Sequence, residues 1–142
     1  MAFCGIICEY NPLHLGHIYH LRKTREIIKN LRGIICVMSG NFTQRGEAAI
    51  ADKYSRARWA IKAGADIVLE LPSVFAAAPA KDFAFGGVRL LSKIKDVKYI
   101  SFGSEYGDIE KVKELAGKLN TADIKRQLGK GSSFASAFGE ID

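Results

Sequence analysis

The chain has 142 residues, of which 48% are hydrophobic and 25% charged, a composition typical of one globular domain and not of a disordered chain. Its net charge of +6 favours an anionic partner such as RNA, a nucleotide or a membrane surface, without choosing among them. No apolar run approaches a membrane span, and the N-terminus lacks a basic signal-peptide segment. We therefore expect a cytoplasmic protein with no membrane among its partners.

The first predicted elements are a strand, a helix and a second strand. Ala2 to Cys8 is a continuous apolar run without alternation, which predicts a strand buried on both faces. His17 to Leu31 has helical spacing, and Gly33 marks its exit before a second buried strand, Gly33 to Met38. The apolar positions on one side of this helix are Ile18, Leu21, Ile28 and Leu31.

The second part of the chain repeats the alternation. Asp52 is positioned to cap a helix over Lys53 to Ala63, which Gly64 ends. A third strand, Asp66 to Leu71, follows. Lys81 to Ile94 is predicted to be a helix that buries Phe85, Val88 and Leu91, although Gly86 and Gly87 weaken it. The remaining predicted elements are a strand, Val97 to Phe102, and two helices, Asp108 to Leu119 and Thr121 to Leu128.

Strands that alternate with helices predict a single α/β domain, residues 1–142, with a Rossmann-like parallel sheet covered by helices on both faces. In such folds ligands bind outside the carboxyl ends of the strands. We expect three loops to meet there: Glu9 to Gly16, Ser39 to Ile50, and Phe102 to Gly107. The cysteines, Cys4, Cys8 and Cys36, form no CxxC pair and are expected to be reduced, buried thiols.

The turn His14-Leu15-Gly16-His17 carries the clearest chemical signal. Gly16 permits close approach of a ligand, and a helix start offers backbone N–H groups to phosphate. His14 and His17 add donors that can stabilise charge on a phosphorus centre under attack, which suits nucleotidyl transfer. Two alternatives are a turn that merely packs and caps, and a zinc site that also uses His20.

The other loops and one helix carry weaker signals. Arg45, in a long polar loop, either clamps a phosphate or carboxylate or is simply solvated. Gly103 either lies against the nucleotide or belongs to an ordinary turn. A basic helix surface either meets RNA phosphates or is only solvated, and it consists of Lys53, Arg56, Arg58 and Lys62.

Two blocks of the sequence resemble the tRNA(Met) cytidine acetate ligase family, which has the nucleotidyltransferase-like fold of the HIGH-motif type. They are Glu9 to His17 (EYNPLHLGH) and Val37 to Glu47 (VMSGNFTQRGE). The match extends through Asp52-Lys53, Gly64-Ala65-Asp66, Glu70-Leu71-Pro72 and Ser101 to Glu105, and covers residues 2 to about 128. Members of this family are much longer, so the C-terminal region that helps them to bind tRNA is expected to be absent from this chain.

The resemblance implies an enzyme that activates acetate with ATP to acetyl-adenylate and acetylates N4 of the wobble cytidine of elongator tRNA(Met). His14, His17 and Arg45 would be catalytic, and Mg²⁺ would accompany the leaving pyrophosphate. The residues implied to bind ATP are Ile7, Cys8, Glu9, Tyr10, Asn11, Pro12, Leu13, His14, Leu15, Gly16, His17, Ile18, Tyr19, His20 and Gly103. Alternatives are an adenylyltransferase that acts on a small cofactor, and an ATP- or RNA-binding module without full activity.

Overall fold

The computed structural model describes residues 1–44, 46–104 and 108–118. The chain divides into two compact units, Met1–Phe102 and Gly103–Asp142. The first unit contains the sheet and the histidine turn. The prediction of a single domain over residues 1–142 stays a prediction.

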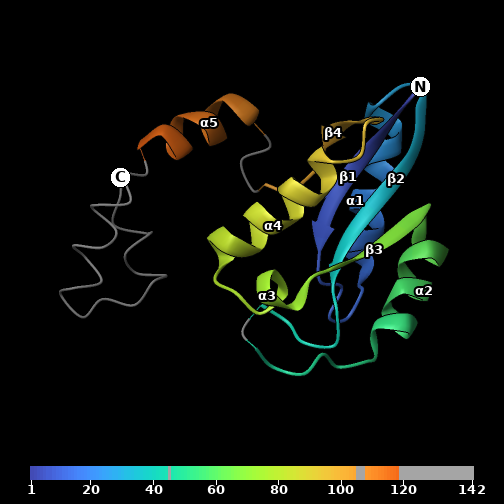
Figure 1. Ribbon diagram of the computed structural model, residues 1–142. Helices are drawn as coiled ribbons and strands as arrows, with labels where there is room; N and C mark the ends of the chain where they lie inside the picture. Colours follow the sequence, from blue (N-terminus) through green and yellow to red (C-terminus); the bar gives the residue numbers. More distant parts are fainter. Residues whose placement is uncertain (45, 105–107, 119–142) are drawn as a thin grey trace. The chain divides into compact units, whose positions relative to one another are not determined.

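A parallel sheet forms the centre of the first unit (Figure 1). Its strands are β1 (Ala2–Cys8), β2 (Leu31–Ser39), β3 (Ile67–Leu71) and β4 (Val97–Ile100). They lie in the order β3-β2-β1-β4, and each pair of neighbours is parallel. The chain therefore moves outward from β1 through β2 to β3 and then returns to the other side of β1. This reversal creates a topological switch point between β1 and β4, where such folds bind ligands.

Helices cover both faces of the sheet, which confirms the predicted fold class (Figure 1). They are α1 (Leu15–Ile27), α2 (Lys53–Ala63), α3 (Ser73–Ala76) and α4 (Ala80–Ser92). Alternate residues of β2 point to opposite faces, as in any strand. Ile34, Cys36 and Met38 pack with Leu21 of α1 and Ala60 of α2. On the other face Ile35 and Val37 pack with Ala76 of α3 and Leu91 of α4.

Helix α1 differs from its prediction at both ends. It begins at Leu15, not at His17, because His14 is its N-cap. It ends at Ile27, and Asn30 takes a left-handed backbone conformation with φ of 60°. Leu31, predicted to be the last helical residue, is instead the first residue of β2. The apolar run from Leu31 onward was therefore divided wrongly between helix and strand.

The residues that begin and end α2 were predicted correctly, whereas the buried face of α4 was predicted wrongly. The Asp52 carboxylate accepts from the N–H groups of Tyr54 and Ser55, and Gly64 follows α2 with φ of 119°. In α4, the expected core residues Phe85 and Val88 are 56% and 43% exposed. Gly86 and Gly87 are buried in their place, together with Leu91, which was predicted correctly.

Close packing explains why glycines occupy that face. A Cβ built on Gly87 would lie 2.7 Å from Cδ1 of Ile7 in β1, and one on Gly86 would lie 2.4 Å from Cγ of Phe75. Gly87 thus lets α4 approach the sheet, and Gly86 lets it approach α3, more closely than any other residue would permit. The short helix α3, which supplies Phe75, was not predicted from the sequence.

The second unit contains α5 (Ile109–Lys118), which agrees with the predicted helix Asp108 to Leu119 to within a residue at each end. The Asp108 carboxylate accepts from the N–H of Glu110, as a helix cap does. The predicted helix Thr121 to Leu128 lies outside the described residues. Among the helices that are described, none combines the length and the apolar character that crossing a bilayer requires. The cysteines are free thiols, as expected, although Cys8 is only partly buried.

Candidate functional site

The structure gathers most of the predicted ATP-binding residues around the carboxyl end of β1. Ile7 and Cys8 end this strand, Glu9 to Leu13 form the loop, and Leu15 to His20 form the first turns of α1. Cys8 pairs with Met38 of β2, so the loops that follow the two strands start side by side. We call the segment Glu9–His14 the first loop and residues 40–51 the second loop.

His14 and His17 cap helix α1 reciprocally. The Nδ1 atom of His14 accepts from the backbone N–H of Gly16 at 3.1 Å. The Nδ1 atom of His17 accepts from the backbone N–H of His14 at 3.2 Å. The two rings also stack, with centroids 3.7 Å apart. This is the geometry of a capping box, with imidazoles in place of the usual hydroxyl and carboxylate.

The cap determines where each ring carries its proton. A neutral imidazole has one N–H and one acceptor nitrogen. Because both Nδ1 atoms accept backbone N–H groups, both rings hold their proton on Nε2. The backbone N–H groups of Gly16, His17 and Ile18 bond to His14 itself, so they are not the free donors that the sequence led us to expect. Two donors that the cap leaves at this helix start are the Nε2–H groups of His14 and His17.

Tyr10 supports His17 from the core. Its side chain is 2% exposed, and its ring centroid lies 4.9 Å from that of His17. The phenol oxygen lies 3.6 Å from Sγ of Cys36 in β2. Burial raises the pKa of Tyr10, so this phenol remains neutral and serves to pack and orient the histidine. Tyr10 takes φ of 47°, a rare conformation for a bulky residue and one often found at functional turns.

A second hydrogen-bond network joins α1 to the end of β4. The Thr24 hydroxyl donates to the carbonyl oxygen of His20 at 2.9 Å, so its oxygen accepts from Ser101 Oγ at 2.8 Å. The Ser101 oxygen in turn accepts from Nε2 of His20 at 2.7 Å. The backbone N–H of Ser101 also donates to Gly5 of β1. These bonds join α1 and β1 to the residue that follows β4, beside the switch point between β1 and β4.

The first and second loops are joined by two side chains of the first. The Glu9 carboxylate accepts from the backbone N–H of Gln44 at 2.7 Å, and the Asn11 side-chain oxygen accepts from that of Ile50 at 2.7 Å. The second loop is folded back on itself, since the backbone N–H of Thr43 donates to the carbonyl oxygen of Glu47 and Phe42 forms an antiparallel β-bridge with Ala48. The meeting of two of the three predicted loops is thus observed.

Two predicted site residues are not placed against this turn. Arg45 lies outside the described residues, between Gln44 and Gly46 of the second loop. Gly103 belongs to the second unit. The zinc alternative gains no support, because no group of three potential ligands is found in the part of the chain that the structure describes.

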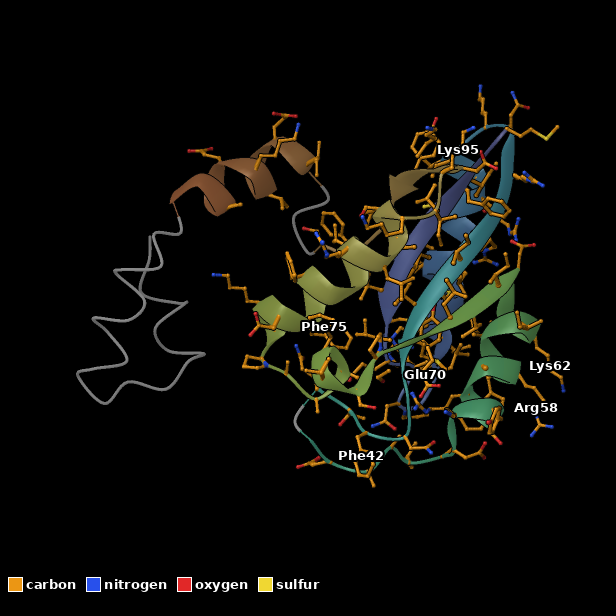
Figure 2. All side chains as sticks on the ribbon, in the orientation of Figure 1. Phe42, Arg58, Lys62, Glu70, Phe75 and Lys95 are labelled. Atoms are coloured by element: carbon orange, nitrogen blue, oxygen red, sulfur yellow. The ribbon has the colours of Figure 1, made fainter. Side chains whose placement is uncertain are left out.

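Arg56 was misassigned by sequence reasoning, which grouped it with the solvated or RNA-facing cations of α2. Its side chain is 0% exposed. It reaches the start of the first loop and both ends of the second, donating for example to the carbonyl oxygen of Glu9 at 2.5 Å. Arg58 and Lys62 of the same helix do point away from the sheet (Figure 2). Neither residue type nor spacing distinguishes Arg56 from its neighbours, so the sequence carried no signal for its role.

We predict that the stability of the fold decreases as the pH falls from about 7 to about 5. Burial lowers the pKa of both His17 and His20 below the ordinary value of 6.5, and the neighbouring His14 and His20 add to the effect at His17. The unfolded chain therefore takes up protons that the folded chain resists. The contribution of His17 and His20 to stability is fully present above their pKa in the unfolded chain. It is lost as the pH falls from there through their lower pKa in the folded chain.

Urea unfolding at a series of pH values measures this effect. The His17→Asn and His20→Asn variants should each show a shallower slope across that window, because each removes one of the two groups. A free energy of unfolding that stays constant or rises on acidification would contradict the prediction.

Comparison with known proteins gives one consistent family. The sequence model described as HIGH Nucleotidyl Transferase matches residues 1–141. The tRNA(Met) cytidine acetate ligase of Caldanaerobacter subterraneus subsp. tengcongensis is 50% identical over 143 aligned residues, which cover 96% of this chain and 35% of that protein. That of Clostridium perfringens (strain SM101) is 53% identical over 116 residues, covering 82% of this chain and 29% of that protein.

A solved structure agrees. The crystal structure of Thermotoga maritima TmcAL bound with alpha-thio ATP has a TM-score of 0.84 and 44% sequence identity, and the match covers 99% of this chain and 35% of that one. The chain thus spans about 35% of the length of such relatives. The resemblance inferred from the sequence blocks is confirmed. Because the family model extends over nearly the whole chain, this chain belongs to the HIGH nucleotidyl transferase family.

Proposed function

We propose that the turn at the carboxyl end of β1 binds ATP, with the Nε2–H groups of His14 and His17 directed at its phosphates. The observation that carries this proposal is the reciprocal cap, which leaves both Nε2–H groups as donors. Fixed donors stabilise charge that develops on phosphate without any reorganisation during the reaction. A relative of the same fold, the Thermotoga maritima protein, has been solved with alpha-thio ATP bound.

The proposed reaction is the activation of acetate followed by acetylation of N4 of the wobble cytidine of elongator tRNA(Met). An acetate oxygen forms a bond to the α-phosphorus of ATP, and the bond to the β-phosphate breaks as pyrophosphate leaves. The N4 amine of cytidine then attacks the acetyl carbon, AMP leaves and the amine loses a proton. The relatives named tRNA(Met) cytidine acetate ligase support this assignment.

Three further assignments belong to the same proposal. Gly103 contacts the nucleotide. Arg45 of the second loop contacts a phosphate or the acetate carboxylate, for which a guanidinium is well suited. Mg²⁺ accompanies ATP and is held mainly by the phosphate oxygens, which is a usual mode of binding for this ion. Among the described residues no cluster of three carboxylate, histidine or cysteine ligands is found.

Acetate-dependent exchange of labelled pyrophosphate into ATP tests the adenylation half without any tRNA. We expect exchange with acetate and little with larger acids or with phosphorylated cofactors. Exchange with a phosphorylated cofactor alone would instead indicate an adenylyltransferase of another substrate class. ATP binding by calorimetry without exchange for any acid would indicate a binding module. Transfer to tRNA is then measured separately with labelled acetate.

A further inference from the structure

Arg56 is a buried cation whose hydrogen bonds are all made inside the protein. A guanidinium group has five N–H donors in a rigid plane. Nη1 donates to the Glu9 carbonyl oxygen at 2.5 Å and to Ser39 Oγ at 3.5 Å. Nη2 donates to the carbonyl oxygens of Ser39, at 3.0 Å, and of Gly40, and Nε donates to that of Ala51 at 3.1 Å. The five donors thus meet five acceptors.

These acceptors mark the start of the first loop and both ends of the second. Glu9 is the first residue of the first loop, which leads to His14. Gly40 and Ala51 are the first and last residues of the second loop, which contains Gln44 and Ile50. One side chain therefore holds the start of the first loop against both ends of the second. Carbonyl oxygens left without a donor in such a buried place would be strongly unfavourable.

Only the planar guanidinium group of arginine, with its donors spread over three nitrogen atoms, can make this set of hydrogen bonds. The acceptors approach Arg56 from the residue after β1, from the end of β2 and from the residue before the Asp52 cap of α2. Lysine offers its three donors from a single nitrogen and cannot reach all three elements at once. The hydrogen bonds from Gln44 to Glu9 and from Ile50 to Asn11 join the same two loops.

We infer that Arg56 is a positioning residue, which fixes the second loop relative to the histidine turn. The catalytic consequence rests on the proposed function: the groups that the two loops present to ATP and to the acid are aligned through this guanidinium. A misplacement of about 1 Å can slow a reaction on the order of 10²-fold while binding persists.

The structural half of the inference is tested by amide hydrogen exchange on the full chain with Arg56→Lys and Arg56→Met. Protection of the Gln44 and Ile50 amides should fall by about tenfold or more, although Arg56 touches neither amide. The β2 amides should keep their protection. Arg58→Met is the matched control, because Arg58 is an exposed cation two positions further along α2, and it should change nothing. Unchanged protection of both amides in folded Arg56→Lys would overturn the inference.

The functional half is a comparison of ATP affinity with turnover in the same variants. We expect the dissociation constant for ATP to change by less than about threefold, while acetate-dependent exchange slows on the order of 10²-fold per folded molecule. A fall in ATP affinity that matches the fall in rate, or full turnover in Arg56→Lys, would reject the positioning role. If the unmodified chain showed no acetate-dependent ATP–pyrophosphate exchange, that result would count against the proposed function. The amide hydrogen-exchange result would still decide the role of Arg56.

Discussion

Replacing His17 by alanine is expected to slow acetate-dependent ATP–pyrophosphate exchange on the order of 10²-fold, the usual effect of removing one donor that stabilises developing charge. The structure gives this residue two roles that the substitution removes together. Its Nε2–H is a donor to phosphate in the proposed function, and its Nδ1 accepts the backbone N–H of His14. Loss of the stacked ring also removes one of the contacts that hold His14 in place.

The His17→Asn variant separates the two roles. The asparagine oxygen lies close to the position of Nδ1 and can still accept from His14, whereas nothing replaces the donor at Nε2. We therefore expect a thermal stability between those of the unmodified chain and His17→Ala, with exchange as slow as in His17→Ala. An exchange rate in either variant equal to that of the unmodified chain would exclude His17 from the reaction.

The largest expected effect on stability comes from Leu91→Ala, which should lower the free energy of unfolding by about 2–5 kcal/mol. Leu91 is 1% exposed and belongs to the apolar cluster between α4 and the sheet. Its removal leaves a cavity in a tightly packed layer. Since small domains are stable by about 5–15 kcal/mol, the loss is a large fraction of the total. Urea unfolding at a fixed pH measures it.

A double-mutant cycle with Gly5 tests the packing directly. A Cβ on Gly5 would lie 2.4 Å from Cδ1 of Leu91, so Gly5→Ala alone should destabilise the fold by about 1–3 kcal/mol. In the double variant the new methyl group occupies space that Leu91 has vacated. We expect the combined loss to be smaller than the sum by about 0.5–3 kcal/mol. Strict additivity would show that the two residues do not contact one another.

The same contacts explain why the buried face of α4 was predicted wrongly. Helical periodicity ranks positions by side-chain hydrophobicity, so it selected Phe85 and Val88 and treated Gly86 and Gly87 as weak points. The observed face is chosen by the distance between α4 and β1. That distance depends on Ile7, and the approach of α4 to α3 depends on Phe75, and both residues lie in other elements. No local pattern in residues 80–92 contains this information.

The histidine turn shows how far a motif can be interpreted. The spacing of His14 and His17 located the helix start to within two residues. It did not reveal that the helix N–H groups bond to His14, nor that both rings carry their proton on Nε2. Those features depend on ring orientation, which Tyr10 helps to set from the core.

The sequence by itself determined the alternation of strands and helices, the Asp52 cap, the Gly64 helix end and the position of the histidine turn. Each of these depends on interactions between residues close together in the chain, and such interactions leave a local pattern. Only the tertiary structure decided that Arg56 is buried and joins two loops, since Glu9 and Arg56 are 47 positions apart. The sequence shows that Arg56 is charged, but its burial depends on carbonyl groups that folding brings together from distant parts of the chain.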